Sequence, residues 1–344
     1  MSHNRYVNLS ARCTAVTAPL VAVAWLSLGG CGSSDSSTGA ASAGSSAASA
    51  GSNSGGSSGA AAAGDSSTLV GSFQVKLTAE SDLGAANTTV VGKVYDGPTP
   101  ATVVWESPQV DGDCTLTTPR VPFCNTPCGG SAACVEDDTC LAYPTARGVG
   151  AVTVSGLAAS PFQLTAVSNT YQAPASATLA YPPFADGDPV SVSAAGDYFG
   201  AFSINAKGIA PLVLQSTGLA LKTGQALELS WAKGATSDAK IHVKLDISHH
   251  GGSKGQIECD TADSGALSVS AALVTKLLNL GVAGYPTVIV TRHSTGSTVI
   301  AAGRVDLEVS SVVEQAVTVE GLASCTSDDD CATGQTCQND LTCK

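Results

Sequence analysis

Apolar and polar residues alternate along several segments between residues 68 and 322. The clearest segment places Ile241, Val243, Leu245 and Ile247 between polar neighbours. Alternation with a period of two gives a strand one buried face and one exposed face. Clusters of Gly, Pro, Asp and Asn separate the segments at short intervals, which predicts antiparallel pairing. Further alternating or apolar segments lie at 73–77, 227–231, 287–291, 304–309 and 316–319.

One segment has helical rather than strand spacing. Ser270 is a suitable N-cap and Gly281 a suitable end, and between them lies an apolar stripe formed by Leu273, Val274, Leu277 and Leu278. The predicted fold class is therefore mainly β: an antiparallel β-sandwich, jelly-roll or Ig-like, with one short helix across one end. No linker-like stretch divides residues 68–322, which favours one large sandwich over two small ones.

The N-terminus has the order of a bacterial signal peptide. Arg5 and Arg12 precede an apolar run that is too short and too interrupted to be a stop-transfer helix. Leu28-Gly29-Gly30-Cys31 follows and resembles the lipobox of bacterial lipoproteins. This resemblance implies that residues 1–30 are removed and that Cys31 carries the lipid. Gly32 stands where enteric lipoproteins of the inner membrane have Asp, which favours the outer membrane.

The residues after Cys31 form a low-complexity segment. Residues 32–67 are almost entirely Ser, Gly and Ala. They contain no large side chains whose burial could offset the entropy cost of ordering the backbone. We therefore expect residues 31–67 to be a lipidated cysteine followed by a flexible tether that holds the folded part away from the membrane.

The charge of the chain is strongly negative. The net charge is −12, and removal of residues 1–30 takes away Arg5 and Arg12 and no acid, which leaves −14. An acidic surface repels phosphate backbones and anionic lipid headgroups. The sequence therefore argues against nucleic acid as a partner and leaves Cys31 as the predicted membrane contact.

Cysteine spacing carries the most specific structural signal. Of the twelve cysteines, Cys13 leaves with the signal peptide and Cys31 is the lipid site. The remaining ten are an even number in an exported chain, so we predict five disulfides. The predicted disulfide cysteines are Cys114, Cys124, Cys128, Cys134, Cys140, Cys259, Cys325, Cys331, Cys337 and Cys343.

Two of the cysteine groups repeat one pattern, in which successive cysteines are six residues apart: Cys128, Cys134 and Cys140 in one, and Cys325, Cys331, Cys337 and Cys343 in the other. Cys124 is the first cysteine of the former group. We call the two groups the inserted knuckle (residues 124–140, within a Cys-rich insertion at 114–140) and the C-terminal knuckle (residues 323–344). Each has four cysteines and three connectivities, of which first-to-third with second-to-fourth is preferred. Cys114 and Cys259 then remain to pair with each other. Zinc is the rival explanation, but the spacing has no C-x-x-C pair and the compartment is oxidising, so no metal is predicted.

The whole layout resembles a class of lipoproteins from myxobacteria and their relatives. These proteins combine a lipobox, a Ser/Gly/Ala linker and a β-rich domain with C-x5-C-x5-C motifs. The residues that carry the resemblance are Leu28 to Cys31 and the two knuckles. The resemblance implies a location in the cell envelope. It implies no activity, so no catalytic residues follow from it.

Several short motifs have a chemical interpretation and a simpler one. His249-His250 can bind a metal or lie in a loop, and the loop is favoured because adjacent strand residues face opposite ways. His242 is expected to be exposed on the polar face of its strand, and His293 follows Arg292 at a strand end and has no visible partner. Asp263-Ser264-Gly265 has the residues of an aspartic protease motif, but it occurs once and lacks the hydrophobic strand before it, so a turn is favoured.

Acidic and aromatic residues give two further alternatives. Calcium ligands are available at 111–113, 186–188 and 328–330, but Asp-Gly pairs are ordinary turns and the spacing is not that of an EF-hand. Trp105, Tyr181 and Phe184 can stack on sugars, although aromatics are scarce and the core also needs them.

Taken together, these observations favour a non-enzymatic envelope lipoprotein that works as a binding, adhesive or structural module. Its expected partners are the membrane, through Cys31, and a surface polysaccharide or envelope protein. The alternative is an anchored hydrolase acting on polysaccharide or peptide, or a carbohydrate-binding module. No cofactor and no catalytic residue is predicted, and the oligomeric state is left open.

Overall fold

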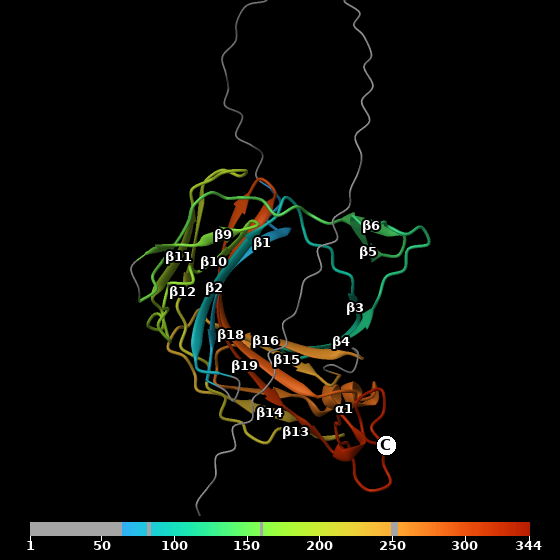
Figure 1. Ribbon diagram of the computed structural model, residues 1–344. Coiled ribbons are helices and arrows are strands. Elements are labelled where there is room, and N and C mark those ends of the chain that lie inside the picture. Colours follow the sequence, from blue (N-terminus) through green and yellow to red (C-terminus); the bar gives the residue numbers. More distant parts are fainter. Residues whose placement is uncertain (1–63, 81–83, 159–160, 249–253) are drawn as a thin grey trace, which may run out of the picture. The chain divides into compact units, whose positions relative to one another are not determined.

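A ten-stranded sheet dominates the computed structural model, which describes residues 64–80, 84–158, 161–248 and 254–344 (Figure 1). The strand order is β3-β4-β16-β15-β18-β19-β1-β2-β10-β9. In that order the strands are Val104–Asp111, Cys114–Arg120, Gln256–Ala262, Lys240–Asp246, Thr287–Ile300, Gly303–Ala316, Leu69–Thr78, Asn87–Val94, Thr170–Gln172 and Thr165–Val167.

A second sheet covers one half of this large sheet. Its order is β12-β11-β7-β8, and the strands are Phe202–Lys207, Pro189–Ala194, Val152–Ser155 and Phe162–Gln163. Buried side chains from both sheets form one hydrophobic cluster, which includes Phe73 and Leu307 from the large sheet and Val154, Val192 and Ile204 from the small one. The fold is therefore mainly β with sheets packed face to face, as the alternating pattern predicts.

The other half of the large sheet packs against the helix α1 and short strand pairs. These pairs are β13 (Ala220–Leu221) with β20 (Thr318–Val319), and β14 (Leu227–Ser230) with β17 (Ala266–Val269). The helix α1 spans Ala271–Asn279, and the Ser270 side chain accepts a hydrogen bond from Leu273 N at 3.3 Å. The second hydrophobic cluster contains Leu273, Val274 and Leu277 of this helix. The predicted cap and stripe are confirmed.

Both hydrophobic clusters lie on the same face of the large sheet. In β18, Val290 belongs to one cluster and Ile300 to the other, and both have even numbers, so their side chains share a face. Arg292 lies on this face between them with 1% of its side chain exposed. One sheet thus supports two apolar cores that are separated by a buried charge.

The strand pairing differs from the antiparallel prediction at two places. β1 pairs in parallel with β19, where Phe73 is opposite Leu307, and β13 pairs in parallel with β20. Parallel neighbours need a long crossover connection, and most of the chain lies between β1 and β19. Local alternation cannot reveal such a contact, because it reports the faces of a strand and not its partner.

The first described residues lie against the large sheet. Gly64 N donates to Ile300 O at 3.0 Å, and Arg304 N donates to Thr68 O at 2.7 Å. The chain therefore enters the fold beside the turn between β18 and β19. Residues 1–63, including the predicted signal peptide and Cys31, lie outside the described residues. Within the described ranges, no helix is long and apolar enough to cross a membrane.

Candidate functional site

Five disulfides join the ten cysteines that follow residue 100. The pairs are Cys114–Cys259, Cys124–Cys134, Cys128–Cys140, Cys325–Cys337 and Cys331–Cys343. These pairs coincide with the preferred first-to-third and second-to-fourth connectivity and with the remaining pair across the domain. Every cysteine in the described part of the chain is therefore covalently paired.

The Cys114–Cys259 disulfide fastens the base of the inserted knuckle. Cys114 of β4 and Cys259 of β16 are direct partners in the antiparallel register, and both are buried. β4 pairs with the edge strand β3 and then leads directly into the inserted knuckle. The bond therefore holds the hairpin that carries this knuckle against the main sheet.

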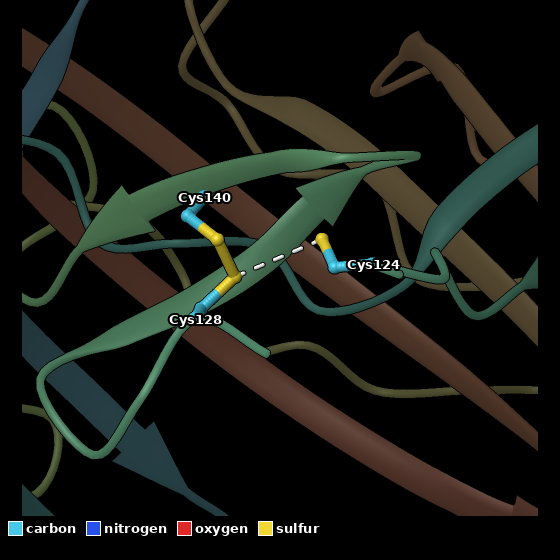
Figure 2. Close-up of side chains that lie close together, drawn as sticks. All are labelled: Cys124, Cys128 and Cys140. Carbon is cyan, nitrogen blue, oxygen red and sulfur yellow. Dashed lines mark hydrogen bonds between the residues drawn. A yellow bond between two sulfur atoms is a disulfide. The ribbon is translucent and has the colours of Figure 1, made fainter. Parts of the chain in front are cut away.

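The inserted knuckle is a small hairpin crossed by two disulfides. Its strands are β5 (Ala132–Glu136) and β6 (Thr139–Ala142), and Cys134 is opposite Cys140 in their register. Figure 2 shows the Cys128–Cys140 disulfide next to Cys124, whose Sγ lies 3.7 Å from Sγ of Cys128. Cys140 is exposed and the other three cysteines are partly exposed. The two disulfides thus form one compact sulfur cluster within reach of solvent.

The carboxylates of Asp137 and Asp138 accept hydrogen bonds that hold the inserted knuckle together. Asp137 accepts hydrogen bonds from Phe123 N at 3.0 Å and from Arg120 Nη1 at 2.7 Å. The hydrogen bond from the Phe123 backbone amide lowers the pKa of the Asp137 carboxyl group, and the positive charge of Arg120 lowers it further. Arg120 also forms an ion pair with Glu106, and the carboxylate of Asp138 accepts a hydrogen bond from Asn125 N at 2.8 Å. The knuckle is held by surface ion pairs and by its own backbone.

Exposed apolar side chains gather in the same part of the sequence. Twelve large hydrophobic residues are exposed in the described ranges, and five of them lie between residues 105 and 143. Isolated exposed apolar residues are normal on a protein surface, whereas contiguous exposed patches mark interaction sites. These five residues are Trp105, Val110, Val121, Phe123 and Tyr143.

The C-terminal knuckle has the same disulfide pattern but is packed against the fold. Cys325 is 1% exposed, Cys343 9% and Thr342 0%. Gly284 N donates to Asp340 O at 2.7 Å, and the Ser324 hydroxyl donates to Gly284 O at 2.6 Å. These hydrogen bonds therefore hold the C-terminal knuckle against the loop after α1.

The acidic run at 328–330, a candidate calcium ligand, shapes the C-terminal knuckle instead. It forms the short 3-10 helix η1 (Asp328–Asp330). Asp328 Oδ1 accepts from Cys337 N at 2.7 Å, and Asp330 Oδ2 accepts from Thr326 N at 2.7 Å. The bonds from Thr326 lower the pKa of Asp330. Two of the three acids are thus engaged by the protein's own donors.

The other two acidic motifs form turns. Gly112 and Gly187 adopt positive φ angles of 60° and 91°, which fit the turn interpretation of both Asp-Gly pairs. Asp186 also accepts hydrogen bonds from Ala235 N at 2.6 Å and from the Thr236 hydroxyl. Burial alone raises the pKa of Asp186, but these hydrogen bonds outweigh burial and lower it.

Asp263 has a structural role that goes beyond the predicted turn. Its carboxylate accepts hydrogen bonds from Arg292 Nε at 2.9 Å, Trp231 Nε1 at 2.7 Å and Gly234 N at 3.0 Å. Arg292 Nη1 also donates to the backbone oxygens of Ala210 and Pro211, at 3.1 Å each. The pair is almost fully buried and ties three segments together between the two cores. The turn that contains Asp263 leads into β17.

The histidines have partners that sequence reasoning missed. His242 Nδ1 lies 2.8 Å from Asp260 Oδ1 on the neighbouring strand β16, and its Nε2 lies 3.9 Å from Glu258 Oε1. The strand register that places His242 opposite Asp260 is the signal that could have found this pair. Burial lowers the pKa of His293, while Glu308 opposes that change. His249 and His250 lie outside the described residues.

The aromatic candidates for sugar stacking are dispersed. Phe184 is 8% exposed and belongs to the first hydrophobic cluster, and Tyr181 packs against that cluster. Trp105, on the edge strand β3, stays 40% exposed. The prediction that the core uses these rings therefore holds for two of the three residues.

Comparisons with known proteins place the chain in no family. No protein-family model and no curated protein matches its sequence. Among solved structures, the crystal structure of chicken CNTN1 FN1-FN3 domains aligns with a TM-score of 0.18 and 10% identity, over 67% of this chain and 78% of that one. This likeness is too weak to support an argument about function.

Proposed function

We propose that the protein is a lipid-anchored lipoprotein of the bacterial cell envelope and serves as a non-enzymatic binding or adhesive module. The observation that carries this proposal is the pairing of all ten cysteines in the described part of the chain. Such dense disulfide bonding persists in oxidising compartments outside the cytoplasm. Cys31 is then the cysteine reserved for the lipid, and outer-membrane attachment follows from Gly32.

The contact surface in this proposal is the inserted knuckle with its flanking side chains. Val121 and Phe123 are 73% and 69% exposed, although both are apolar. Covering them with a partner removes apolar surface from water, which is favourable at roughly 25 cal/mol per Å². An envelope protein suits this surface better than a polysaccharide, because two of the five exposed residues are aliphatic and cannot stack on sugars.

Anchoring is tested by replacing the lipid site and fractionating the cells. We expect Cys31→Ser to move the protein from the membrane fraction to the soluble fraction, because the acidic chain has no other predicted hold on lipid. Cys13→Ser is the matched control, since Cys13 lies in the segment that is removed, and it should leave the protein in the membrane. Membrane retention of the Cys31→Ser protein contradicts the proposal.

Binding is tested with the soluble Cys31→Ser protein and isolated envelope fragments. Adding Phe123→Ser should lower the amount retained several-fold, because it removes the most exposed aromatic side chain beside the knuckle. Val213→Ser is the matched control, since Val213 is also exposed, at 56%, but lies outside the segment. Equal losses for both variants contradict the assignment of the surface.

A further inference from the structure

We propose that Asp111 is a modification site at which the folded protein spontaneously forms isoaspartate. The chain contains two Asp-Gly pairs, Asp111-Gly112 and Asp186-Gly187. Glycine favours this reaction because it has no side chain that shields its own nitrogen from the preceding carboxyl group. The fold leaves the reacting groups of the first pair free and engages those of the second. Isomerisation in the folded protein is therefore directed to Asp111.

The reaction needs no reagent other than water. Gly112 N attacks Cγ of the protonated Asp111 carboxyl group, and a C–N bond forms. A C–O bond breaks, and the hydroxyl group leaves with the amide proton as water. Water then opens the resulting succinimide ring at either of its two carbonyl carbons. Opening at Cγ restores aspartate, whereas opening at the original backbone carbonyl gives isoaspartate, whose main chain runs through Cβ and Cγ. No oxidation or reduction takes place.

Both reacting groups are free at Asp111-Gly112. The pair lies where β3 turns into β4 at the edge of the large sheet (Figure 1). Both residues are exposed, and a Cβ added at Gly112 would meet no atom within 4 Å. In the part of the chain that the structure describes, Gly112 N donates to no backbone oxygen. The nitrogen and the carboxyl group thus have room to approach each other, and attack within one small ring benefits from their proximity.

Both reacting groups are engaged at Asp186-Gly187. Gly187 N donates to Gly208 O at 2.9 Å. The Asp186 carboxylate accepts hydrogen bonds from Ala235 N at 2.6 Å, from Thr236 N at 3.2 Å and from the Thr236 hydroxyl. These bonds lower the pKa of Asp186, so less of the reactive protonated form is present. Ring closure here requires the loss of these hydrogen bonds and of the one from Gly187 N.

The modification is expected to loosen β3. Asp111 is opposite Cys114 in the register that closes the hairpin, and isoaspartate adds one carbon atom to the main chain at this point. β3 is the edge strand and is held in the large sheet by β4. Because β3 carries Trp105 and Val110, the modification also alters the contact surface proposed above, although the reaction itself does not depend on that function.

The site is tested by incubating the oxidised wild-type protein in water enriched in a heavy oxygen isotope. Each opening of the succinimide ring adds one heavy oxygen, and peptide mass mapping with fragmentation locates the label and the isoaspartate. We expect label to enter at Asp111 at least tenfold faster than at Asp186, because Asp186 reacts only after local opening of the fold. Equal labelling at the two sites, or faster labelling at Asp186, overturns the proposal.

The unfolded chain is the control for local sequence. The two sites read Val-Asp-Gly-Asp-Cys and Ala-Asp-Gly-Asp-Pro, so each Asp-Gly pair has an apolar residue before it and Asp after it. In the reduced, denatured chain we expect similar labelling rates at Asp111 and Asp186. If the difference found in the folded protein persists after unfolding, the flanking residues and not the fold cause it, and the proposal is overturned.

The effect on β3 is tested with Asp111→Glu. This variant keeps the negative charge, but its side chain is one carbon too long to close the same ring. After incubation, we expect the amides of β3 to exchange hydrogen several-fold faster in the isoaspartate-containing wild-type protein than in fresh protein, because the edge strand opens more often. Incubated Asp111→Glu should match its fresh sample. Isoaspartate at Asp111 without faster exchange in β3, or equal acceleration in Asp111→Glu, contradicts this effect.

Discussion

The inserted knuckle and the C-terminal knuckle share a cysteine pattern and a disulfide pairing, but their surroundings differ. In the inserted knuckle, Cys140 is exposed and Asp137 is paired with a surface arginine. In the C-terminal knuckle, Thr342 is fully buried, and Asp340 receives a hydrogen bond from the loop after α1 through its backbone oxygen.

This difference shows that the disulfide pattern determines local shape and not role. The same two disulfides can present a hairpin to solvent or lie in a segment that is hydrogen-bonded to the loop after α1. What decides between these roles is the neighbouring sequence. Apolar Phe123 stays 69% exposed beside the inserted knuckle, whereas Cys343 and Thr342 of the other knuckle are covered by the fold.

Removal of the Cys114–Cys259 disulfide, which joins the hairpin before the inserted knuckle to the large sheet, is expected to have the largest effect on stability. The bond closes a separation of 145 residues, and the chain-entropy model assigns about 5 kcal/mol to a loop of this size. We expect the double alanine variant to lose stability on that scale in denaturant unfolding. An unchanged midpoint means that β3–β4 and the inserted knuckle depend little on this bond.

The buried ion pair provides a reference that touches neither knuckle. Asp263→Ala leaves Arg292 charged and unpaired between the two cores, which is expected to cost about 3–5 kcal/mol. Calorimetry should show one unfolding transition at a lower temperature, because the two hydrophobic clusters share the large sheet. If only one hydrophobic cluster unfolds earlier, the two cores are less coupled than the shared sheet suggests.

Removing one disulfide from each knuckle tests the comparison directly. Cys331→Ala/Cys343→Ala should lower the free energy of unfolding by about 3 kcal/mol, because the bond spans 12 residues and its knuckle is hydrogen-bonded to the loop after α1. The matched Cys128→Ala/Cys140→Ala spans the same 12 residues but should hardly change global unfolding, because it loosens only the hairpin. Similar losses in both variants contradict the proposed difference.

Lowering the pH is predicted to destabilise both knuckles over the same pH range, because each depends on one carboxylate with a lowered pKa. The pKa values of Asp137 and Asp330 lie below the ordinary value of 3.8, because backbone amides donate to both carboxylates. A lowered folded pKa gives stabilisation that is present above pH 3.8 and is lost as the pH falls through the folded value. NMR titration of the Phe123 and Thr326 amides should show midpoints below 3.8, and midpoints at or above it contradict the assignment.

Much of the fold could be predicted from local patterns. Alternation located β15, β18 and β19, because each has one face on a core and one face away from it. Ser270 was predictable as an N-cap, because a serine hydroxyl at this position accepts a hydrogen bond from the backbone amide three residues later, here that of Leu273. The disulfide pairs agree with the connectivity that was preferred among the three possible in each knuckle.

The remaining features depend on contacts between distant segments. The parallel pairing of β1 with β19, the Asp263–Arg292 pair and the His242–Asp260 pair each require the register of the final sheet. The different environments of the two knuckles are also invisible in the sequence. Their cysteines repeat at nearly the same spacing, and burial is decided by what the rest of the chain places beside them.

Hydrogen exchange of the oxidised wild-type protein tests the central difference most directly. Cys325 N and Cys343 N donate to backbone oxygens within the docked C-terminal knuckle, and Tyr143 N, just after the inserted knuckle, donates to Ser131 O within it. We predict that the amides of Cys325 and Cys343 exchange at least tenfold more slowly than that of Tyr143, after correction for intrinsic rates, because Cys325 and Cys343 are 1% and 9% exposed whereas Tyr143 is 53% exposed. Equal protection, or slower exchange in the inserted knuckle, contradicts the account.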